Sequence, residues 1–344
     1  MQRVPHMRLL AITIDTEADT GPSWIGQTPE SYRNVGRLET LLLPIADRLG
    51  IPITLLLNGD VIVRDVPAHV CDRLHRTAGW ELGTHLHGEF EMPELRYSGP
   101  AGVKLRDLQA SYSADVEFGK MSSITNHFSD RFGRLPTSFR AGRFGASMRT
   151  LEYCADLGYE VDRSVVPGQC WWEDDTKIDF TAFSPDPRII RRNHKALVEL
   201  PITVKPGRLP FSFNRRLQHV LNSRTHKKRG VPSSLGRCIR RVTSVLLRPV
   251  WLRPSYASAD QMCALLRWLA GAYGSSPIVA NMMFHSSELL PGASPYTQTE
   301  DDVNAFLERL TMALRTAGDL EYRFATLSES ARAVKSHVST GTLS

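Results

Sequence analysis

Short runs of aliphatic and β-branched residues alternate along the chain with longer stretches whose apolar residues recur at helical spacing. This alternation is typical of βα units that join into a parallel sheet. The predicted strands cover residues 9–14, 51–57, 81–85, 137–140, 159–162, 197–202, 278–285 and 322–326. The predicted helices cover residues 35–49, 69–77, 103–132, 147–157, 260–273 and 299–316. Seven or eight such units favour an α/β barrel over a doubly wound sheet, because no glycine-rich phosphate loop follows the first strand.

The region between residues 205 and 257 interrupts this alternation. It begins as a turn-rich basic stretch and continues with a predicted amphipathic helix. The apolar face of that helix is formed by Leu235, Ile239, Val242, Leu246 and Val250. We therefore expect a single domain over residues 1–334, interrupted by a basic amphipathic insert at 205–257, and a disordered tail at 335–344.

The distribution of charge separates this insert from the rest of the chain. The 344 residues include 42 Lys and Arg against 36 Asp and Glu, a net charge of +6. Residues 200–259 contain 13 Lys and Arg and no acidic residue, so the remaining 29 basic and 36 acidic residues carry −7. A cationic amphipathic segment favours peripheral contact with an anionic membrane, and its few aromatic residues argue against nucleic acid. The alternative is a helix that packs on the barrel with its arginines in water.

Cysteine usage and hydropathy indicate the compartment. The five cysteines are scattered and show no metal-ligand spacing, which argues against a disulfide framework or a structural zinc site. The chain contains neither an apolar leader at its start nor an apolar run of about 18 residues. We expect a cytoplasmic protein, peripheral at the inner membrane surface if the insert docks there.

Three carboxylates follow the first predicted strand, in the sequence TIDTEAD: Asp15, Glu17 and Asp19. In a barrel of this kind the active site lies at the carboxyl ends of the strands. Alternation along a strand puts Asp15 and Glu17 on one side, so that one could act as a base while the other binds a cation. The alternative is a solvated acidic loop.

Two histidines follow the third predicted strand, in the sequence GTHLHGEFE. His85 and His87, together with a carboxylate from the first cluster, would supply the three protein ligands of a catalytic metal site. A single histidine is more often structural, but this pair next to an acidic strand end favours a divalent metal. Glu89 is the alternate ligand.

Two further strand ends carry candidate side chains. Arg140 could orient a neighbouring carboxylate or keep it ionised, or it could form a purely structural ion pair. Arg143 is predicted to face solvent or substrate. His285 suits a general acid because the pKa of imidazole lies near neutrality, with a structural histidine as the alternative. Glu288, in the same loop, is predicted to contact substrate.

Taken in order, the sequences TIDTEAD, ELGTHLH, FRAGRFG and MMFHSSEL resemble the motifs of the polysaccharide deacetylase superfamily, the NodB-homology enzymes of the carbohydrate esterase family 4 kind. Within it the chain resembles a divergent branch with D-x-E and H-x-H motifs. The resemblance covers roughly residues 8–204 and 258–330 and leaves the insert outside. It implies a distorted (β/α)7-type barrel with one divalent metal ion, commonly zinc, that activates water for attack on an N-acetyl carbonyl.

The resemblance also implies roles for individual residues. Asp15 matches the family's catalytic base, and Arg140 matches the arginine that tethers this base. His285 matches the general acid that protonates the leaving amine. His85 matches the first histidine ligand of the metal.

Two departures from the family pattern affect the remaining ligands. The family's adjacent pair of aspartates is Asp15-Thr16 here, so the carboxylate ligand is expected at Glu17. The family's second histidine, four residues after the first, is Glu89 here. His87 is therefore the expected second nitrogen ligand, with Glu89 as the alternate.

Two tryptophans are candidates for stacking on a sugar ring: Trp24 in the loop after the first strand, and Trp172 in a loop after residue 162. Tryptophan offers a large apolar face to a sugar, although burial under a loop is the commoner explanation of such residues.

Three functions are compatible with these motifs. The first is a metal-dependent hydrolase that removes an N-acetyl group from an N-acetylated sugar in a glycan, a glycolipid precursor or a metabolite. The second is a cyclic amide or ureide hydrolase on the same barrel. The third is a barrel without catalytic activity that binds an anionic surface through its basic insert.

Overall fold

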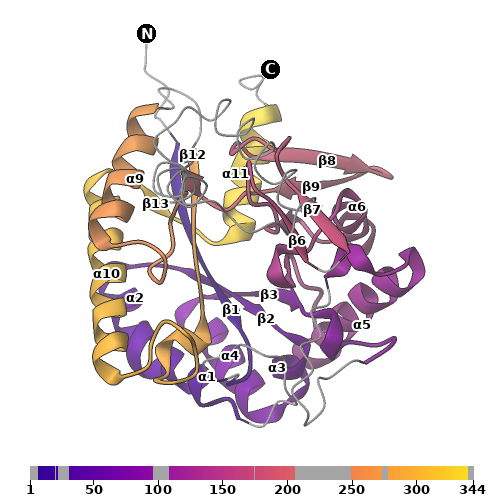
Figure 1. Cartoon of the computed structure of the whole chain (residues 1–344), viewed down its shortest axis with the longest axis horizontal. Helices are drawn as coiled ribbons and strands as arrows, with labels where there is room; N and C mark the ends of the chain where they lie inside the picture. The colour runs from indigo at the N-terminus through magenta and orange to yellow at the C-terminus, as the bar shows by residue number, and fades with distance from the viewer. Residues whose placement is uncertain are drawn as a thin grey trace, which may run out of the picture.

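A curled mixed sheet forms the centre of the molecule (Figure 1). The structure is a computed structural model and describes residues 7–19, 21, 31–95, 108–173, 175–205, 249–272 and 278–339. The strands of the sheet follow the order β12-β1-β2-β3-β4-β5-β9-β8, and β13 also pairs with β1. All of these pairings are parallel except that between β8 and β9. The sheet with its surrounding helices confirms the expected distorted barrel, in the form of a curled half-barrel.

The strands of this sheet lie close to the predicted positions. They are β1 (Arg8–Thr16), β2 (Ile53–Leu57), β3 (Glu81–Leu86), β4 (Ser138–Ala141), β5 (Val161–Asp162), β8 (Arg188–Arg192), β9 (Lys195–Glu199), β12 (Ile278–His285) and β13 (Arg323–Phe324). Only β8 has no counterpart among the predicted strands. Three of its five residues are arginines and only Ile190 is buried, because β8 is the last strand in the order and pairs only with β9.

The two faces of β1 have different neighbours. Leu10, Ile12 and Ile14 belong to the main apolar core. Ala11 packs in a second, smaller cluster with Leu327 of helix α11. Because side chains alternate along a strand, Thr13 and Asp15 lie on the same face as Ala11. This face is therefore apolar near the amino end of β1 and polar near its carboxyl end.

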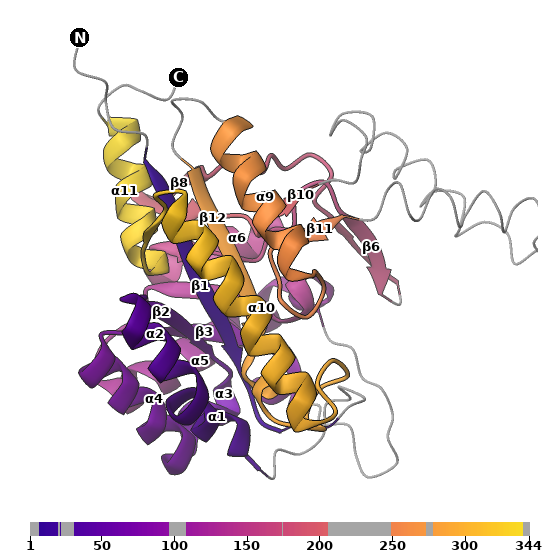
Figure 2. The ribbon, with the colours of Figure 1, turned by 90° about the vertical axis from the view of Figure 1, so that its left-hand side faces the viewer.

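Helices surround the sheet on its outside (Figure 2). The longer ones are α2 (Leu43–Leu49), α4 (Asp65–Ala78), α5 (Ala114–Phe132), α6 (Met148–Leu157), α9 (Ala259–Ala272), α10 (Glu300–Asp319) and α11 (Leu327–Ser339). Short ones are α1 (Arg33–Arg37) and α3 (Gly59–Val63). None of the helices in the described ranges is both long enough and apolar enough to cross a membrane.

Two predicted helices differ from the observed ones. The predicted helix at 35–49 is divided into α1, a π-helical turn at Leu38–Leu42 and α2, and Pro44 lies in the first turn of α2, where its missing N–H cannot bond to the preceding turn. The predicted helix at 103–132 begins at residue 114, where Ser113 caps it by accepting a hydrogen bond from the Val116 N–H.

The carboxyl-terminal part of the chain also differs from the sequence prediction. Helix α11 extends to Ser339, so residues 335–339 of the expected tail are helical. Most of the expected insert, residues 206–248, lies outside the described residues. Its two ends are described: β10 (Val204–Lys205) pairs antiparallel with β11 (Val250–Trp251), so that residues 205 and 250 are neighbours.

Candidate active site

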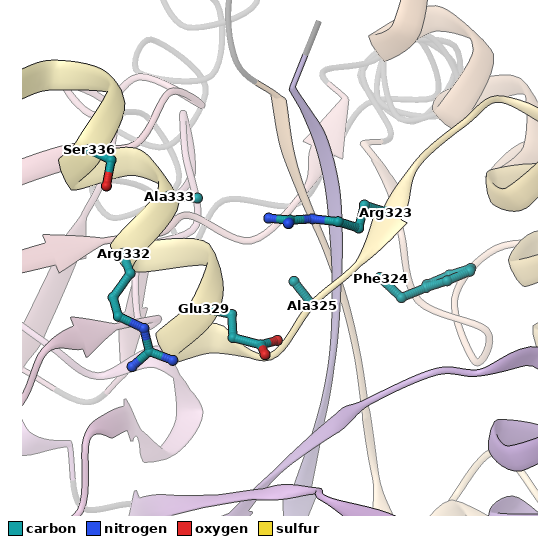
Figure 3. Close-up of a pocket in the computed structure, with 7 residues that line it drawn as sticks. All are labelled: Arg323, Phe324, Ala325, Glu329, Arg332, Ala333 and Ser336. Carbon is teal, nitrogen blue, oxygen red and sulfur yellow. The ribbon is translucent and has the colours of Figure 1, made fainter. Parts of the chain in front are cut away.

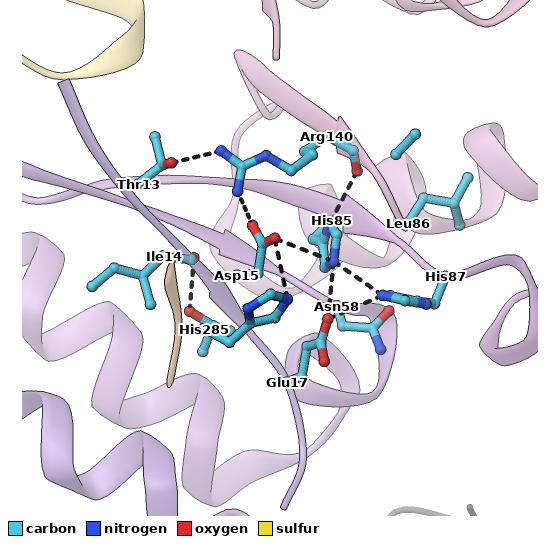
Figure 4. Close-up of polar contacts among 12 residues, drawn as sticks. Thr13, Ile14, Asp15, Glu17, Asn58, His85, Leu86, His87, Arg140 and His285 are labelled. Atoms are coloured by element: carbon cyan, nitrogen blue, oxygen red, sulfur yellow. Dashed lines mark hydrogen bonds and ion pairs between the residues drawn. The ribbon is translucent and has the colours of Figure 1, made fainter. Parts of the chain in front are cut away.

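The register of the strands brings the candidate residues together at the carboxyl end of the sheet. Asp15 in β1 is the direct partner of His285 in β12. His85 in β3 is the direct partner of Arg140 in β4. Since β1 and β3 are separated only by β2, these two pairs face one another across the curl of the sheet. Distant parts of the chain thus build one polar site (Figure 4).

The buried carboxylate of Asp15 forms an ion pair with Arg140. Arg140 Nη1 donates to Asp15 Oδ1, and Arg140 Nη2 donates to Thr13 Oγ1 at 2.6 Å. Burial would raise the pKa of Asp15, but the charge of Arg140, followed by those of His85 and His285, holds this pKa below its usual value. Asp15 is therefore an ionised carboxylate in a buried place, which suits a general base.

Glu17, His85 and His87 converge on a single point (Figure 4). Glu17 Oε1 lies 2.9 Å from His85 Nε2 and 3.0 Å from His87 Nε2. The two Nε2 atoms are 3.1 Å apart. Three donor atoms of the kinds that zinc binds are thus close neighbours, and one cation between them would satisfy all three. The residues present fit a divalent metal, and they are the set expected from the sequence.

The backbone fixes the orientation of His85. Its Nδ1 lies 3.2 Å from the carbonyl oxygen of Arg140, which can only accept a hydrogen bond, so we assign a ring proton to Nδ1. This bond orients the ring with its Nε2 atom toward Glu17. Metal-binding histidines in proteins usually have such an outer partner.

The charges of Glu17 and His87 stabilise each other. Burial would raise the pKa of Glu17, but His87 and the hydrogen bond with His85 hold this pKa well below its usual value. Burial would lower the pKa of His87, but Glu17 and then Glu89 raise it to about 9. A metal ion that binds here would replace the positive charge of His87, because a ligand imidazole is neutral.

His285 approaches Asp15 from the opposite side. His285 Nε2 lies 3.7 Å from Asp15 Oδ2, and the same oxygen lies 3.7 Å from His85 Nε2. Asp15 Oδ2 therefore lies between the imidazole of His285 and the cluster of Glu17, His85 and His87, which we call the three-ligand cluster. A base at Asp15 is therefore close both to the candidate metal ligands and to the candidate acid, His285.

Glu288 lies behind His285, where it is completely buried. Its Oε1 accepts from Arg253 Nη2 at 2.7 Å and lies 3.3 Å from His285 Nδ1. Ser255 Oγ donates to its other oxygen at 2.5 Å. From the sequence, Glu288 is expected to contact substrate, whereas its carboxylate is surrounded by these three side chains. This arrangement supports a role in orienting His285.

Glu89 lies behind His87 and outside the three-ligand cluster. Its Oε1 is 3.5 Å from His87 Nδ1 and 2.5 Å from Arg143 Nη2. Arg143, which was expected to face substrate or solvent, is partly buried and has a φ of 53°, in the left-handed region that favours glycine. The geometry favours His87 over Glu89 as the ligand.

The two candidate tryptophans remain predictions. Trp172 lies in β6 (Cys170–Glu173), which forms a hairpin with β7 (Thr176–Asp179), and 45% of its surface is exposed. Trp24 lies outside the described residues.

Sequence reasoning missed Arg253 and Thr13. No signal distinguished Arg253, because it is one of 13 basic residues in the acid-free segment. The two-residue periodicity of β1 could have identified Thr13, which lies on the same face as Asp15 and bonds to Arg140.

A cavity of about 420 Å³ lies away from this site, between β13 and α11 (Figure 3). It is lined by residues that include Arg323, Glu329 and Arg332. Strand β13 pairs with Leu9 and Leu10, at the amino end of β1, whereas the polar site lies at the carboxyl end of the same strand. The cavity is therefore separate from the candidate active site.

Comparison with known proteins shows similarity at the level of structure. No family model matches the chain, and no curated protein is significantly similar to it in sequence. Among solved structures, a protein from Mycobacterium smegmatis described as a polysaccharide deacetylase matches with a TM-score of 0.51 and 15% identity, over 97% of this chain and 92% of that one. The allantoinase PuuE matches with a TM-score of 0.50 and 13% identity, over 98% and 92%. The chain thus has the fold of the polysaccharide deacetylase superfamily.

Proposed function

We propose that this protein is a metal-dependent hydrolase that removes the N-acetyl group from an N-acetylated sugar. The observation that carries the proposal is the position of Asp15 Oδ2, 3.7 Å from both His85 Nε2 and His285 Nε2. A three-ligand metal site, a carboxylate base and an imidazole acid, with the carboxylate between the other two, are the groups that amide hydrolysis requires.

The exposure of the side chains indicates how substrate approaches. Asp15 and His85 are almost completely buried, with 3% and 2% of their side chains exposed. Glu17, His87 and His285 keep 14%, 12% and 13%. A substrate carbonyl therefore approaches from the side of Glu17, His87 and His285, while Asp15 is held beneath them.

The residues of this chain account for the proton transfers. Asp15 accepts a proton from the attacking water, and Arg140 keeps the Asp15 carboxylate ionised for this task. His285 delivers a proton from Nε2 to the leaving amine, while Glu288 holds the opposite side of its ring. The base and the acid are close enough to act on the same substrate amide group, because Asp15 Oδ2 and His285 Nε2 are 3.7 Å apart.

Glu17, His85 and His87 would hold the metal, for which zinc is the best match to one carboxylate and two imidazoles. When bound, such an ion would polarise the substrate carbonyl and lower the pKa of water.

The test is an acetate-release assay with the full chain supplied with zinc. Acetylated mono- and oligosaccharides should release acetate, and chelation should abolish the release. An Asp15→Asn variant serves as the inactive control. If no acetylated sugar releases acetate, the proposed substrate class is wrong.

The same experiment addresses cyclic ureides. The allantoinase PuuE shares the fold, so allantoin belongs in the panel. Hydrolysis of allantoin without any release of acetate would replace the deacetylase by a ureide hydrolase. Hydrolysis of neither substrate class would contradict both forms of the proposal.

A further inference from the structure

A lysine is buried beneath the loop that follows His87. Lys120, in helix α5, has only 1% of its surface exposed. Its Nζ donates to the carbonyl oxygens of Gly88 at 2.8 Å, Glu91 at 2.8 Å, Pro93 at 2.5 Å and Glu94 at 3.0 Å. The backbone of residues 88–94 is therefore wrapped around one ammonium group.

This geometry requires a positive charge at its centre. An ammonium has three N–H donors, yet four carbonyl oxygens lie within 3.0 Å of Lys120 Nζ. Carbonyl oxygens that converge in this way repel one another unless a cation lies between them. Burial of an ammonium is in turn costly unless polar groups replace its water. The loop and Lys120 are thus complementary.

The loop is also held by Tyr112. A Cβ atom at Gly88 would lie 2.6 Å from the ring of Tyr112, so this position accepts only glycine without displacement. The same ring lies 4.7 Å from Lys120 Nζ. The backbone directly after His87 is therefore held by both Tyr112 and Lys120, which also contact each other.

The confined loop carries the groups that fix His87. Gly88 is the next residue in the chain, and Glu89 lies 3.5 Å from His87 Nδ1. A loop that moved away from Lys120 would take both the backbone and the outer partner of His87 with it. The position of His87 Nε2, 3.0 Å from Glu17, depends on these two connections.

We propose that Lys120 is a positioning residue for the metal site, whose ammonium holds residues 88–94 so that His87 reaches Glu17 and His85. This inference rests on the proposed metal-dependent function. According to this inference, a buried lysine that touches neither metal nor substrate controls the zinc affinity of the site.

The experiment compares zinc dissociation constants of full-length variants by titration calorimetry. Lys120→Met removes the charged Nζ and keeps an unbranched chain of otherwise equal length, and we expect it to weaken zinc binding at least tenfold. Hydrogen exchange of the amides at 88–94 should accelerate in the same variant. Thr125→Val is the matched control, because Thr125 lies on the same helix and loses a buried hydrogen bond to Tyr159 without touching the loop. We expect this control to keep the zinc dissociation constant within twofold.

Two milder variants keep the test decisive if Lys120→Met does not fold. Lys120→Arg keeps the charge, and Lys120→Gln keeps donors without it, so zinc affinity should fall in the order Lys, Arg, Gln. A folded Met or Gln variant with the wild-type dissociation constant would overturn the inference. Absence of zinc binding by the wild type would instead contradict the proposed function itself, and the inference with it.

Discussion

Asp15 combines two properties that rarely occur together, since it is both buried and held ionised. The ion pair with Arg140 is the main reason for this combination, because the charge of the guanidinium, together with those of His85 and His285, outweighs the effect of burial on the pKa of Asp15. The residue types of this pair were predictable from their motifs. Their contact was implied only by the family resemblance, because it depends on the curl of the sheet across β2 and β3, which the periodicity of the sequence does not reveal.

Substitution of Asp15 separates proton transfer from metal binding. Asp15→Asn keeps the shape of the side chain but removes the base, and we expect kcat for acetate release to fall by about 10²- to 10⁴-fold. Zinc affinity should change little, because Asp15 lies outside the three-ligand cluster. Asp19→Asn, in the same motif, is the control and should change kcat less than threefold. Equal losses in the two variants would exclude Asp15 as the base.

The buried pair of Glu288 and Arg253 predicts a strong energetic coupling. Glu288→Gln leaves the Arg253 guanidinium buried without a carboxylate, and we expect a loss of about 3–5 kcal/mol in the free energy of unfolding. The double variant Glu288→Gln, Arg253→Met should lose less than the sum of the single variants, because neither charge is then left alone. Urea unfolding of the three variants measures this coupling. Additive losses would show that the pair is not coupled.

At the scale of elements, hydrophobic patterning identified most of the sheet. Runs such as 278–285 are buried along nearly their whole length, and such runs mark central parallel strands. The pattern failed for β8, the antiparallel partner of β9, because three of its five residues are arginines and only Ile190 is buried. It also failed within 35–49, because apolar spacing does not reveal a π-helical turn.

Strand β5 carries a buried carboxyl group that makes stability depend on pH. Burial raises the pKa of Asp162 to about 6, above its ordinary value of 3.8. The stabilising contribution of this group is therefore fully present below pH 3.8 and is lost as the pH rises through 6. The free energy of unfolding of Asp162→Asn, minus that of the wild type, should therefore rise by on the order of 2 kcal/mol between pH 4 and pH 7.

Urea unfolding of both proteins across this pH range provides the test. The Ser164 N–H donates to Asp162 Oδ2 at 2.9 Å, and an asparagine amide group at that place would lose this bond. That loss adds an offset that does not change with pH. A difference in stability that stays constant from pH 4 to pH 7 would contradict the predicted pKa.

At the scale of the whole molecule, the site is assembled from both ends of the chain. Strand β12 inserts next to β1 and brings His285 beside Asp15. The basic segment leaves this framework at β10 and returns at β11, and Arg253 then enters the site. Sequence composition assigned Arg253 to the insert, because charge alone cannot distinguish a buried arginine from its exposed neighbours.

This arrangement predicts that the basic segment is separable from the fold. Replacing residues 206–248 by a short turn should leave a folded protein that binds zinc, since residues 205 and 250 are already neighbours. The segment carries 11 of the basic residues, so its loss should abolish co-sedimentation with anionic liposomes at low salt. Equal co-sedimentation of the two proteins would contradict a membrane role. The deletion must stop before Arg253.

The central claim is that Glu17, His85 and His87 bind one metal ion on which deacetylation depends. Its most direct test is a zinc titration of the metal-free protein, with the rate of acetate release from an acetylated sugar as the readout. We predict no release without metal, and a rate that rises with added zinc and saturates at one equivalent. Acetate release that is already complete in the metal-free protein, or a rate that zinc does not change, would contradict the account.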